Sequence, residues 1–223
     1  MPNLLHLDSS ARTASFSRDL GARFARRWRE AYPNGGYTYR DLTREPIPPI
    51  GEAWTQICDT MLAEQITDPA RYREAVRTPS QHRAWDVVQP LFDELLAADV
   101  VLIGVPMYNF SVPASLKAWI DQVTFPRMNL AGKRFVVAGA RGGSYVEGAP
   151  RAPYDHQERY LRDFIAGHFA VQDVRFVHAE LTNARLDPGL AHLRDRHTAS
   201  VTAALTRIEA VADELAAELE AVS

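Results

Sequence analysis

The stretch from residue 100 to residue 110 constrains the fold of this chain more than any other. Its first six residues, Val-Val-Leu-Ile-Gly-Val, are apolar without alternation, which is typical of a strand covered on both faces in a parallel sheet. Pro106 ends that strand because it has no N–H to donate to a neighbouring strand. The next four residues are large or hydrogen-bonding, namely Met107, Tyr108, Asn109 and Phe110.

Ligands bind at the carboxyl ends of the strands in open parallel sheets, so residues 107–110 are candidates for a binding site. The segment 111–121 that follows is predicted to form a helix with Pro113 in its first turn. The four side chains would also serve simply to close the core beside that helix. Taken alone, the stretch predicts a strand, a turn and a helix, and it leaves both explanations of residues 107–110 open.

Predicted strands and helices alternate along the rest of the chain. Strands are predicted over residues 4–7, 37–42, 100–105, 134–139 and 173–179. The second and the last of these are expected at the edges of the sheet. Helices are predicted over residues 15–32, 52–67, 81–98, 111–123, 155–169 and 189–222. Pro90 is expected to kink or split the third helix. This order predicts a single α/β domain over residues 1–223, with five parallel strands and helices on both faces.

Composition excludes several classes of partner and site. A net charge of -3 argues against nucleic acid or an anionic membrane as a partner, and no apolar run approaches the length of a membrane span. Cys58 is the only cysteine, so we expect a structural thiol and no internal disulfide. The first residues carry no basic segment of a secretory signal, so a cytoplasmic location is the default expectation. The histidines show no metal-ligand spacing. No metal is therefore predicted, and His6 is expected to be a core residue.

The loop after the first strand is rich in hydroxyl groups and leads directly into a helix, and Ser10, Ser15 and Ser17 are its candidates for binding a ligand. Hydroxyl groups and free N–H groups at a helix N-terminus suit a phosphate, although Ser15 or Ser17 would equally suit an ordinary helix cap. The glycine patterns of nucleoside triphosphate loops and dinucleotide loops are absent. If the strands take the order 2-1-3-4-5, this loop lies beside the loops that follow the third and fourth strands.

Those two neighbouring loops offer a different chemistry. Residues 107–110 present flat, polarizable surface and one amide, which suits an aromatic ring with hydrogen-bonding edges. The loop after the fourth strand contains Gly142 and Gly143, which would let a planar ligand approach the backbone unless they form an ordinary turn. A ligand with a phosphate at one end and a broad heteroaromatic ring at the other fits all three loops, and FMN is such a ligand.

Several motifs resemble those of the FMN-dependent NADH-azoreductase and quinone reductase family, and the similarity extends through nearly the whole chain. The motifs are Leu7-Asp8-Ser9-Ser10, Ser15-Phe16-Ser17, Pro106-Met107-Tyr108-Asn109-Phe110, Pro113, Leu116-Lys117 and Arg141-Gly142-Gly143. The resemblance implies a flavodoxin-like, three-layer α/β fold with strand order 2-1-3-4-5. It also implies an FMN site made of Ser10, Ser15, Phe16, Ser17, Met107, Tyr108, Asn109, Phe110, Ala140, Arg141, Gly142 and Gly143.

The resemblance also implies an activity. NADH or NADPH would reduce bound FMN and leave, and a quinone or an aromatic azo compound would then take two electrons in a ping-pong reaction. No side chain is predicted to act as a catalytic acid or base. Members of the family are homodimers with flavin at the subunit boundary, so a homodimer is expected. An exposed Trp54 would favour a partner, unless it packs on its own chain.

The chain departs from the family pattern in three places. Ala140 stands where serine is common, so one hydroxyl contact to the cofactor would be lost. Residues 124–132 form a shorter link than usual, and residues 43–80 form a longer segment. Because the corresponding segment of the relatives is longer and helps to wall their substrate pocket, we expect the range of substrates to differ more than the binding of flavin.

Two other functions remain open at this point. A flavodoxin-like electron carrier would bind FMN without NADH-linked turnover of its own, although such carriers are usually more acidic so that they dock with basic partners. A non-catalytic regulator on the same fold would bind no flavin.

Overall fold

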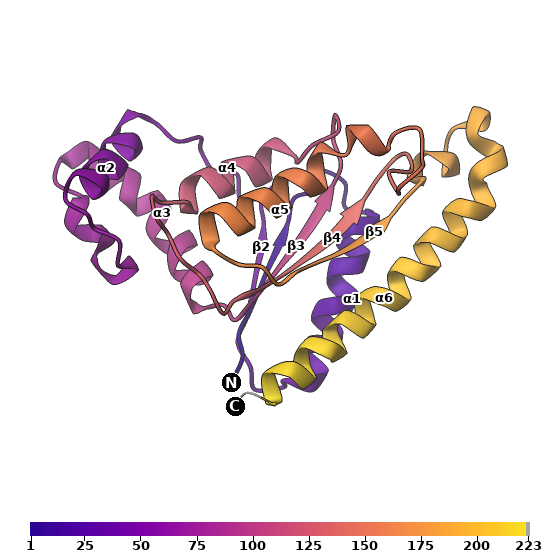
Figure 1. The fold of residues 1–223 in the computed structure, drawn as a ribbon, viewed down its shortest axis with the longest axis horizontal. Coiled ribbons are helices and arrows are strands. Elements are labelled where there is room, and N and C mark those ends of the chain that lie inside the picture. Colours follow the sequence, from indigo (N-terminus) through magenta and orange to yellow (C-terminus); the bar gives the residue numbers. More distant parts are fainter. Residues whose placement is uncertain (222–223) are drawn as a thin grey trace.

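The computed structural model, which describes residues 1–221, is built around a five-stranded parallel sheet in the order β2-β1-β3-β4-β5 (Figure 1). The strands are β1 (Leu4–Asp8), β2 (Tyr37–Asp41), β3 (Val100–Pro106), β4 (Arg134–Ala140) and β5 (Val174–Ala179). The predicted fold class, strand order and edge strands are confirmed. β3 lies at the centre, where every one of its residues is buried, as its unbroken apolar run requires.

Helices cover both faces of the sheet, with α1 and α6 side by side on one face and α3, α4 and α5 on the other (Figure 1). The helices are α1 (Phe16–Ala31), α2 (Glu52–Ala63), α3 (Pro79–Ala97), α4 (Ala114–Val123), α5 (His156–Phe169) and α6 (Arg194–Glu220). Short 3-10 turns are η1 (Pro69–Ala75), η2 (Ala152–Tyr154), η3 (Thr182–Arg185) and η4 (Pro188–Leu193). No helix within residues 1–221 is both long enough and apolar enough to cross a membrane.

Several helix boundaries differ from the prediction, and α2 ends at Ala63 instead of at residue 67. Three of the differences have local causes. α3 begins at Pro79 because Thr78 and Gln81 form a reciprocal cap, and it continues through the exposed Pro90 without splitting. Pro113 caps α4 from outside its first turn. The last helix begins at Arg194, after η4, because the chain first makes a 3-10 turn there. The final residue of that predicted helix, 222, lies outside the described residues.

Strand alternation sorts side chains between two cores. In β1, Leu4 joins the core under α1 and α6, whereas Leu5 and Leu7 join the core under α3, α4 and α5. Because successive side chains of a strand point to opposite faces, His6 and Asp8 lie on the α1 face with Leu4. The same rule separates Ala140 from its neighbour Arg141 at the end of β4.

The long segment 43–80 packs against α3 rather than over the sheet edge. Its helix α2 lies beyond α3 at one end of the molecule (Figure 1). Trp54 is half-buried there, where its indole N–H donates to the Gln122 carbonyl (3.2 Å) and its ring stacks on Phe125 with centroids 5.6 Å apart. The expected exposure of Trp54 is therefore wrong, because this ring is part of its own chain's core. Cys58 is buried and unpaired in the same cluster.

Candidate functional site

A cavity of about 470 Å³ lies at the carboxyl ends of β1, β3, β4 and β5, within the usual size of a ligand site. The structure brings together ten of the residues singled out from the sequence: Ser10, Ser15, Phe16, Met107, Tyr108, Asn109, Phe110, Ala140, Gly142 and Gly143. Ser17 and Arg141 do not line this cavity. The three predicted loops therefore meet at one place.

Sequence reasoning missed a fourth loop, which follows β5. It contributes four residues to the cavity wall: Thr182, Asn183, Arg185 and Leu186. A signal was available, since β5 pairs with β4 in the predicted order and its carboxyl end must lie at the same edge. Arg12 and Arg151 complete the polar lining. Within residues 1–221 the guanidinium groups of Arg12, Arg151 and Arg185 form no ion pair, so the cavity lining carries three positive charges without a carboxylate partner.

One end of the cavity is the N-terminus of α1. Ser15 is the cap residue, with an extended backbone, but its side chain makes no capping hydrogen bond. Its hydroxyl lies 3.0 Å from the hydroxyl of Ser17, which is fully buried. The first N–H groups of an α-helix have no acceptor within the helix, so this uncapped end offers donors and a favourable dipole to an anion.

A tight turn between β3 and α4 forms the opposite wall. Tyr108 and Ser111 exchange two backbone hydrogen bonds of 3.1 and 2.9 Å, and both central residues, Asn109 (φ 48) and Phe110 (φ 67), are left-handed. This geometry suits Asn109, whereas for Phe110 it costs about 1–2 kcal/mol. Phe110 is 41% exposed, so it gains little from burial in this chain. A strained backbone at an exposed aromatic residue is typical of a position that contacts a ligand.

The loop after β4 supplies backbone donors. Gly142 lets the Asn183 side chain pack close to the loop, because a Cβ at this position would lie 2.6 Å from Nδ2 of Asn183. The carbonyls of Gly142 and Gly143 accept hydrogen bonds from the N–H groups of Asn183 (3.2 Å) and Leu181 (3.0 Å). Within residues 1–221 the N–H groups of Gly142 and Gly143 have no acceptor, so the loop can donate both to a ligand.

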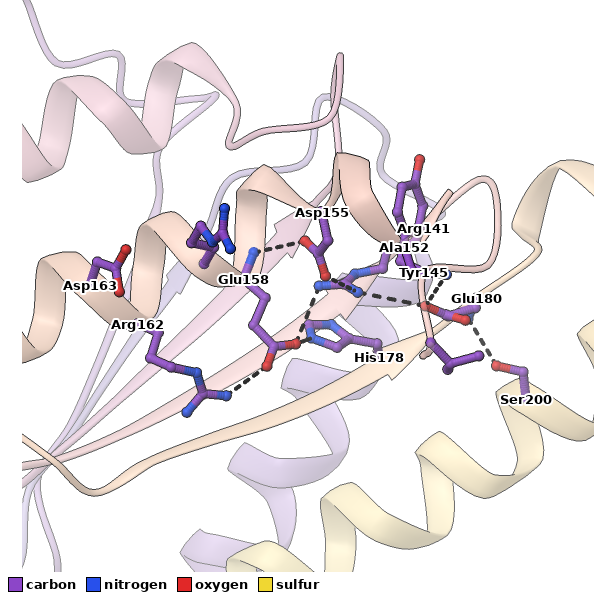
Figure 2. Close-up of a pocket in the computed structure, with 12 residues that line it drawn as sticks. Arg141, Tyr145, Ala152, Asp155, Glu158, Arg162, Asp163, His178, Glu180 and Ser200 are labelled. Carbon is purple, nitrogen blue, oxygen red and sulfur yellow. Dashed lines mark hydrogen bonds and ion pairs between the residues drawn. The ribbon is translucent and has the colours of Figure 1, made fainter. Parts of the chain in front are cut away.

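Arg141 lies behind this loop, on the α5 side of the sheet and outside the cavity, whereas the preceding residue Ala140 lines the cavity. Figure 2 shows its guanidinium surrounded by three carboxylates, at 2.7 Å from Asp155, 3.5 Å from Glu158 and 3.6 Å from Glu180. The side chain is only 3% exposed. The sequence assigned Arg141 to the cofactor, but its charge is used inside the protein instead.

Glu180 also holds the loop that follows β4, which we call the glycine loop (residues 142–145). Its two carboxylate oxygens accept hydrogen bonds from the Ser144 hydroxyl (2.8 Å) and the Tyr145 N–H (3.0 Å) (Figure 2). Glu158 accepts from His178 at 2.9 Å, and this bond, with help from Arg162 and Arg141, lowers the pKa of Glu158 to about 2. Arg141 therefore sits among carboxylates that hold α5, β5 and the glycine loop together.

The end of β1 carries a second buried polar group, Asp8. Its carboxylate accepts from the Tyr39 hydroxyl (2.9 Å) and packs against Gly104, where any side chain would collide with it. Burial raises the pKa of Asp8 to about 6, although Tyr39 and Arg18 oppose that shift. His6 beside it accordingly stays neutral, because burial lowers its pKa to about 4. His6 is a buried core residue, as predicted.

Replacing Asp8 with asparagine should stabilise the protein at pH 7. The folded-state pKa of about 6 lies above the ordinary value of 3.8, so Asp8 contributes stability below pH 4 that is lost as the pH rises through 6. That loss amounts to about 3 kcal/mol at most. The Asp8→Asn variant would recover about 1–2 kcal/mol of it, because the substitution also weakens the hydrogen bond from Arg18.

Urea unfolding of both proteins at pH 7 and at pH 4 measures this effect. The gain in free energy of unfolding should be present at pH 7 and vanish toward pH 4. The same substitution at the exposed Asp86 controls for the loss of a surface charge. A variant that is less stable than the parent at pH 7, or equally shifted at both pH values, would contradict this account.

The departures noted in the sequence fall at different distances from the cavity. Ala140 lines it and contributes no hydroxyl, so that contact is absent in this chain. The link 124–132 and the segment 43–80 contribute no lining residue. Within residues 1–221 no group of three or more His, Cys, Asp or Glu side chains is arranged to hold a metal ion.

Comparison with known proteins extends over most of the chain. Residues 2–201 match a family model described as a flavodoxin-like fold. A protein from Nocardia farcinica named FMN-dependent NADH:quinone oxidoreductase is 64% identical over 205 residues, which cover 92% of this chain and 95% of that protein. A protein of the same name from a Nostoc species is 37% identical over 196 residues, covering 82% and 88%. The solved structure of an FMN-dependent NADH-azoreductase from Bacillus anthracis in complex with FMN has a TM-score of 0.75 at 19% identity, covering 97% of this chain and 100% of that one.

Proposed function

Because this chain belongs to the flavodoxin-like family that includes the FMN-dependent NADH:quinone oxidoreductases, we propose that it is an enzyme that uses bound FMN to transfer two electrons from NADH or NADPH to a quinone. The observation that carries this proposal is the cavity at four strand ends. It has an uncapped helix N-terminus at one end and two donor-rich loops at the other. An electron carrier without NADH-linked turnover is not favoured, given the name and the 64% identity of the relative.

The cavity residues fit FMN by chemistry. The first turn of α1, with Ser10, Ser15 and Phe16, would hold the phosphate, and Arg12 and Arg185 lie close enough to line the same space. Residues 107–110 and 140–143 would hold the ribityl chain and the ring. Within this set Ser17 acts by holding the Ser15 hydroxyl. Arg141 acts from behind the loop.

Bound FMN supplies the two-electron redox chemistry. The chain positions it and shapes the space for the substrates. The free N–H groups of Gly142 and Gly143 would stabilise negative charge near the pyrimidine edge of the ring. Phe110 lies 5.5 Å from Tyr154 and 6.4 Å from Tyr145 between ring centroids, so aromatic faces flank the mouth, where a quinone or an aromatic azo compound would stack. No side chain of the cavity is needed as an acid or base.

We also propose that residues 1–223 form one FMN-binding domain. Two copies of this chain would form a homodimer. Large apolar side chains are exposed at the rim of the cavity: Tyr108, Phe110 and Leu186 line it, and Tyr154 packs against Phe110. Clustered exposed apolar groups mark contact surfaces, and a second copy of the chain would cover them. Because Trp54 packs within its own chain, it no longer argues for a dimer, and the exposed rim is the feature that favours one.

Sedimentation at micromolar concentration should give twice the mass of 25.0 kDa, and a monomer would contradict the dimer. A reducing cytoplasm suits the free Cys58 and a nicotinamide donor.

The visible spectrum of the purified protein tests the core of the proposal. We expect the absorption bands of oxidised flavin, their bleaching when NADH is added without oxygen, and steady NADH oxidation when menadione is present. Bleaching only through a partner protein would favour an electron carrier. Colourless protein that takes up no added FMN would favour a non-catalytic regulator and overturn the proposal.

A further inference from the structure

Arg18 lies in the first turns of α1, behind the serine loop (residues 9–17) and outside the cavity that this loop borders. Its guanidinium donates to two carbonyls of that loop, through Nη2 to Ser10 (2.7 Å) and through Nε to Arg12 (3.0 Å). The side chain is 15% exposed. No residue motif drew attention to it, because its acceptors are backbone carbonyls and the side chains of two different strands.

The other side of the guanidinium is anchored at the ends of two strands. Nη1 and Nη2 lie 2.8 and 3.0 Å from the two carboxylate oxygens of Asp41, and Nη1 lies 3.4 Å from Asp8. Although burial opposes it, hydrogen bonding from Arg18 and Thr43 lowers the pKa of Asp41 well below its usual range. Asp41 is therefore a permanently charged anchor, and the planar fork of Arg18 is held in one orientation.

The two carbonyl bonds determine which way the loop's N–H groups face. In a trans peptide the C=O and the following N–H point in opposite directions. With the Ser10 and Arg12 carbonyls turned toward Arg18, the N–H groups of Ala11 and Thr13 are turned away from it. The Ala11 N–H does reach the hydroxyl of Tyr108 (3.3 Å), a residue of the cavity wall. The Ala11 N–H thus points toward the cavity wall, on the side of the loop that faces away from Arg18.

We propose that Arg18 is a positioning residue for phosphate recognition: by holding the carbonyls of Ser10 and Arg12 behind the serine loop, it keeps the loop's N–H side toward the phosphate of FMN. This inference rests on the proposed function. Arg18 does not act as a charge for the phosphate, because Asp41 and Asp8 already surround its guanidinium. Loss of Arg18 frees two carbonyl oxygens to turn toward the phosphate and repel it.

The test compares FMN with riboflavin, which has the same ring and no phosphate. Flavin-free full-length protein is titrated with each by fluorescence quenching, for the parent, Arg18→Gln and Arg18→Lys. We expect the Kd for FMN to rise on the order of 10–100-fold in Arg18→Gln and the Kd for riboflavin to stay nearly unchanged. Arg18→Lys should rescue little, because one ammonium cannot span both carbonyls and Asp41.

Arg23→Gln is the matched control on the same helix, since Arg23 pairs within residues 1–221 with the exposed Asp19 and the half-buried Glu209 and touches no part of the serine loop. Both Kd values should be unchanged in it. If Arg18→Gln does not fold, Asp41→Asn releases the anchor and should give the same selective loss of FMN. An equal loss for both flavins, or no loss, would overturn the positioning role while leaving the proposed function standing. A parent protein that binds neither flavin would overturn the proposed function, and this inference with it.

Discussion

Replacing Arg141 with methionine is expected to lower the free energy of unfolding by about 3–5 kcal/mol, because removing one partner of a buried ionic cluster leaves uncompensated charge. The guanidinium is 3% exposed and is shared by Asp155, Glu158 and Glu180. Methionine has a similar length and no charge, so the three carboxylates would face one another without their central cation. The glycine loop should loosen as well, because Glu180 holds Ser144 and Tyr145.

Urea unfolding of the parent and of Arg141→Met measures the loss. Arg162→Met is the matched control, since Arg162 reaches the same Glu158 from α5 but is 53% exposed. An exposed pair of this kind should cost less than about 1 kcal/mol. Adding Glu180→Gln to Arg141→Met should restore part of the stability by removing one of the unpaired charges. Equal losses for the two arginines would show that burial of the cluster has no energetic consequence.

Replacing Ser15 with aspartate should move fold stability and FMN affinity in opposite directions. Asp is a good N-cap and its charge suits the helix N-terminus, so α1 should gain about 0.5–1 kcal/mol at a position whose serine makes no capping bond. In the proposed site the same carboxylate would face the phosphate. Two like charges about 5 Å apart at an effective dielectric constant near 20 repel by about 3 kcal/mol, so the Kd for FMN should rise about 100-fold.

Titrations with FMN and riboflavin, together with thermal unfolding of the flavin-free protein, separate the two effects. Riboflavin should bind Ser15→Asp as well as it binds the parent, because it carries no phosphate. Ser15→Asn keeps the shape without the charge and should retain most of the FMN affinity. If Ser15→Asp binds FMN as tightly as Ser15→Asn does, the phosphate does not lie at the N-terminus of α1.

The order of elements and the location of the cavity could be predicted from the sequence because each depends on short-range patterns. An unbroken apolar run predicts the central strand β3, and a proline ends it. Strand-helix alternation predicts a parallel sheet, whose carboxyl ends share one edge by topology. Ten of the predicted residues meet there for that reason, since each belongs to the end of a strand, to the connection between that strand and the next helix, or to the first residue of that helix.

Side-chain partners that are distant in the sequence were decided only by the tertiary structure. Arg141 turns to Asp155, Glu158 and Glu180, and Arg18 turns to Asp41, although the motif alone placed Arg141 at the ligand. Trp54 packs on Phe125, 71 positions away in the sequence, and is not an exposed side chain left for a second subunit to cover.

Apolar periodicity and chain breakers specify where a segment lies, because they act through the backbone of neighbouring residues. These patterns do not specify which carboxylates pair with a buried arginine. Such pairs form between groups that meet only when the helices pack against the sheet. In this protein the sequence by itself determined the sheet, its binding edge and the loops that border it. The packed structure decided which arginines face the cavity and which hold its loops from behind.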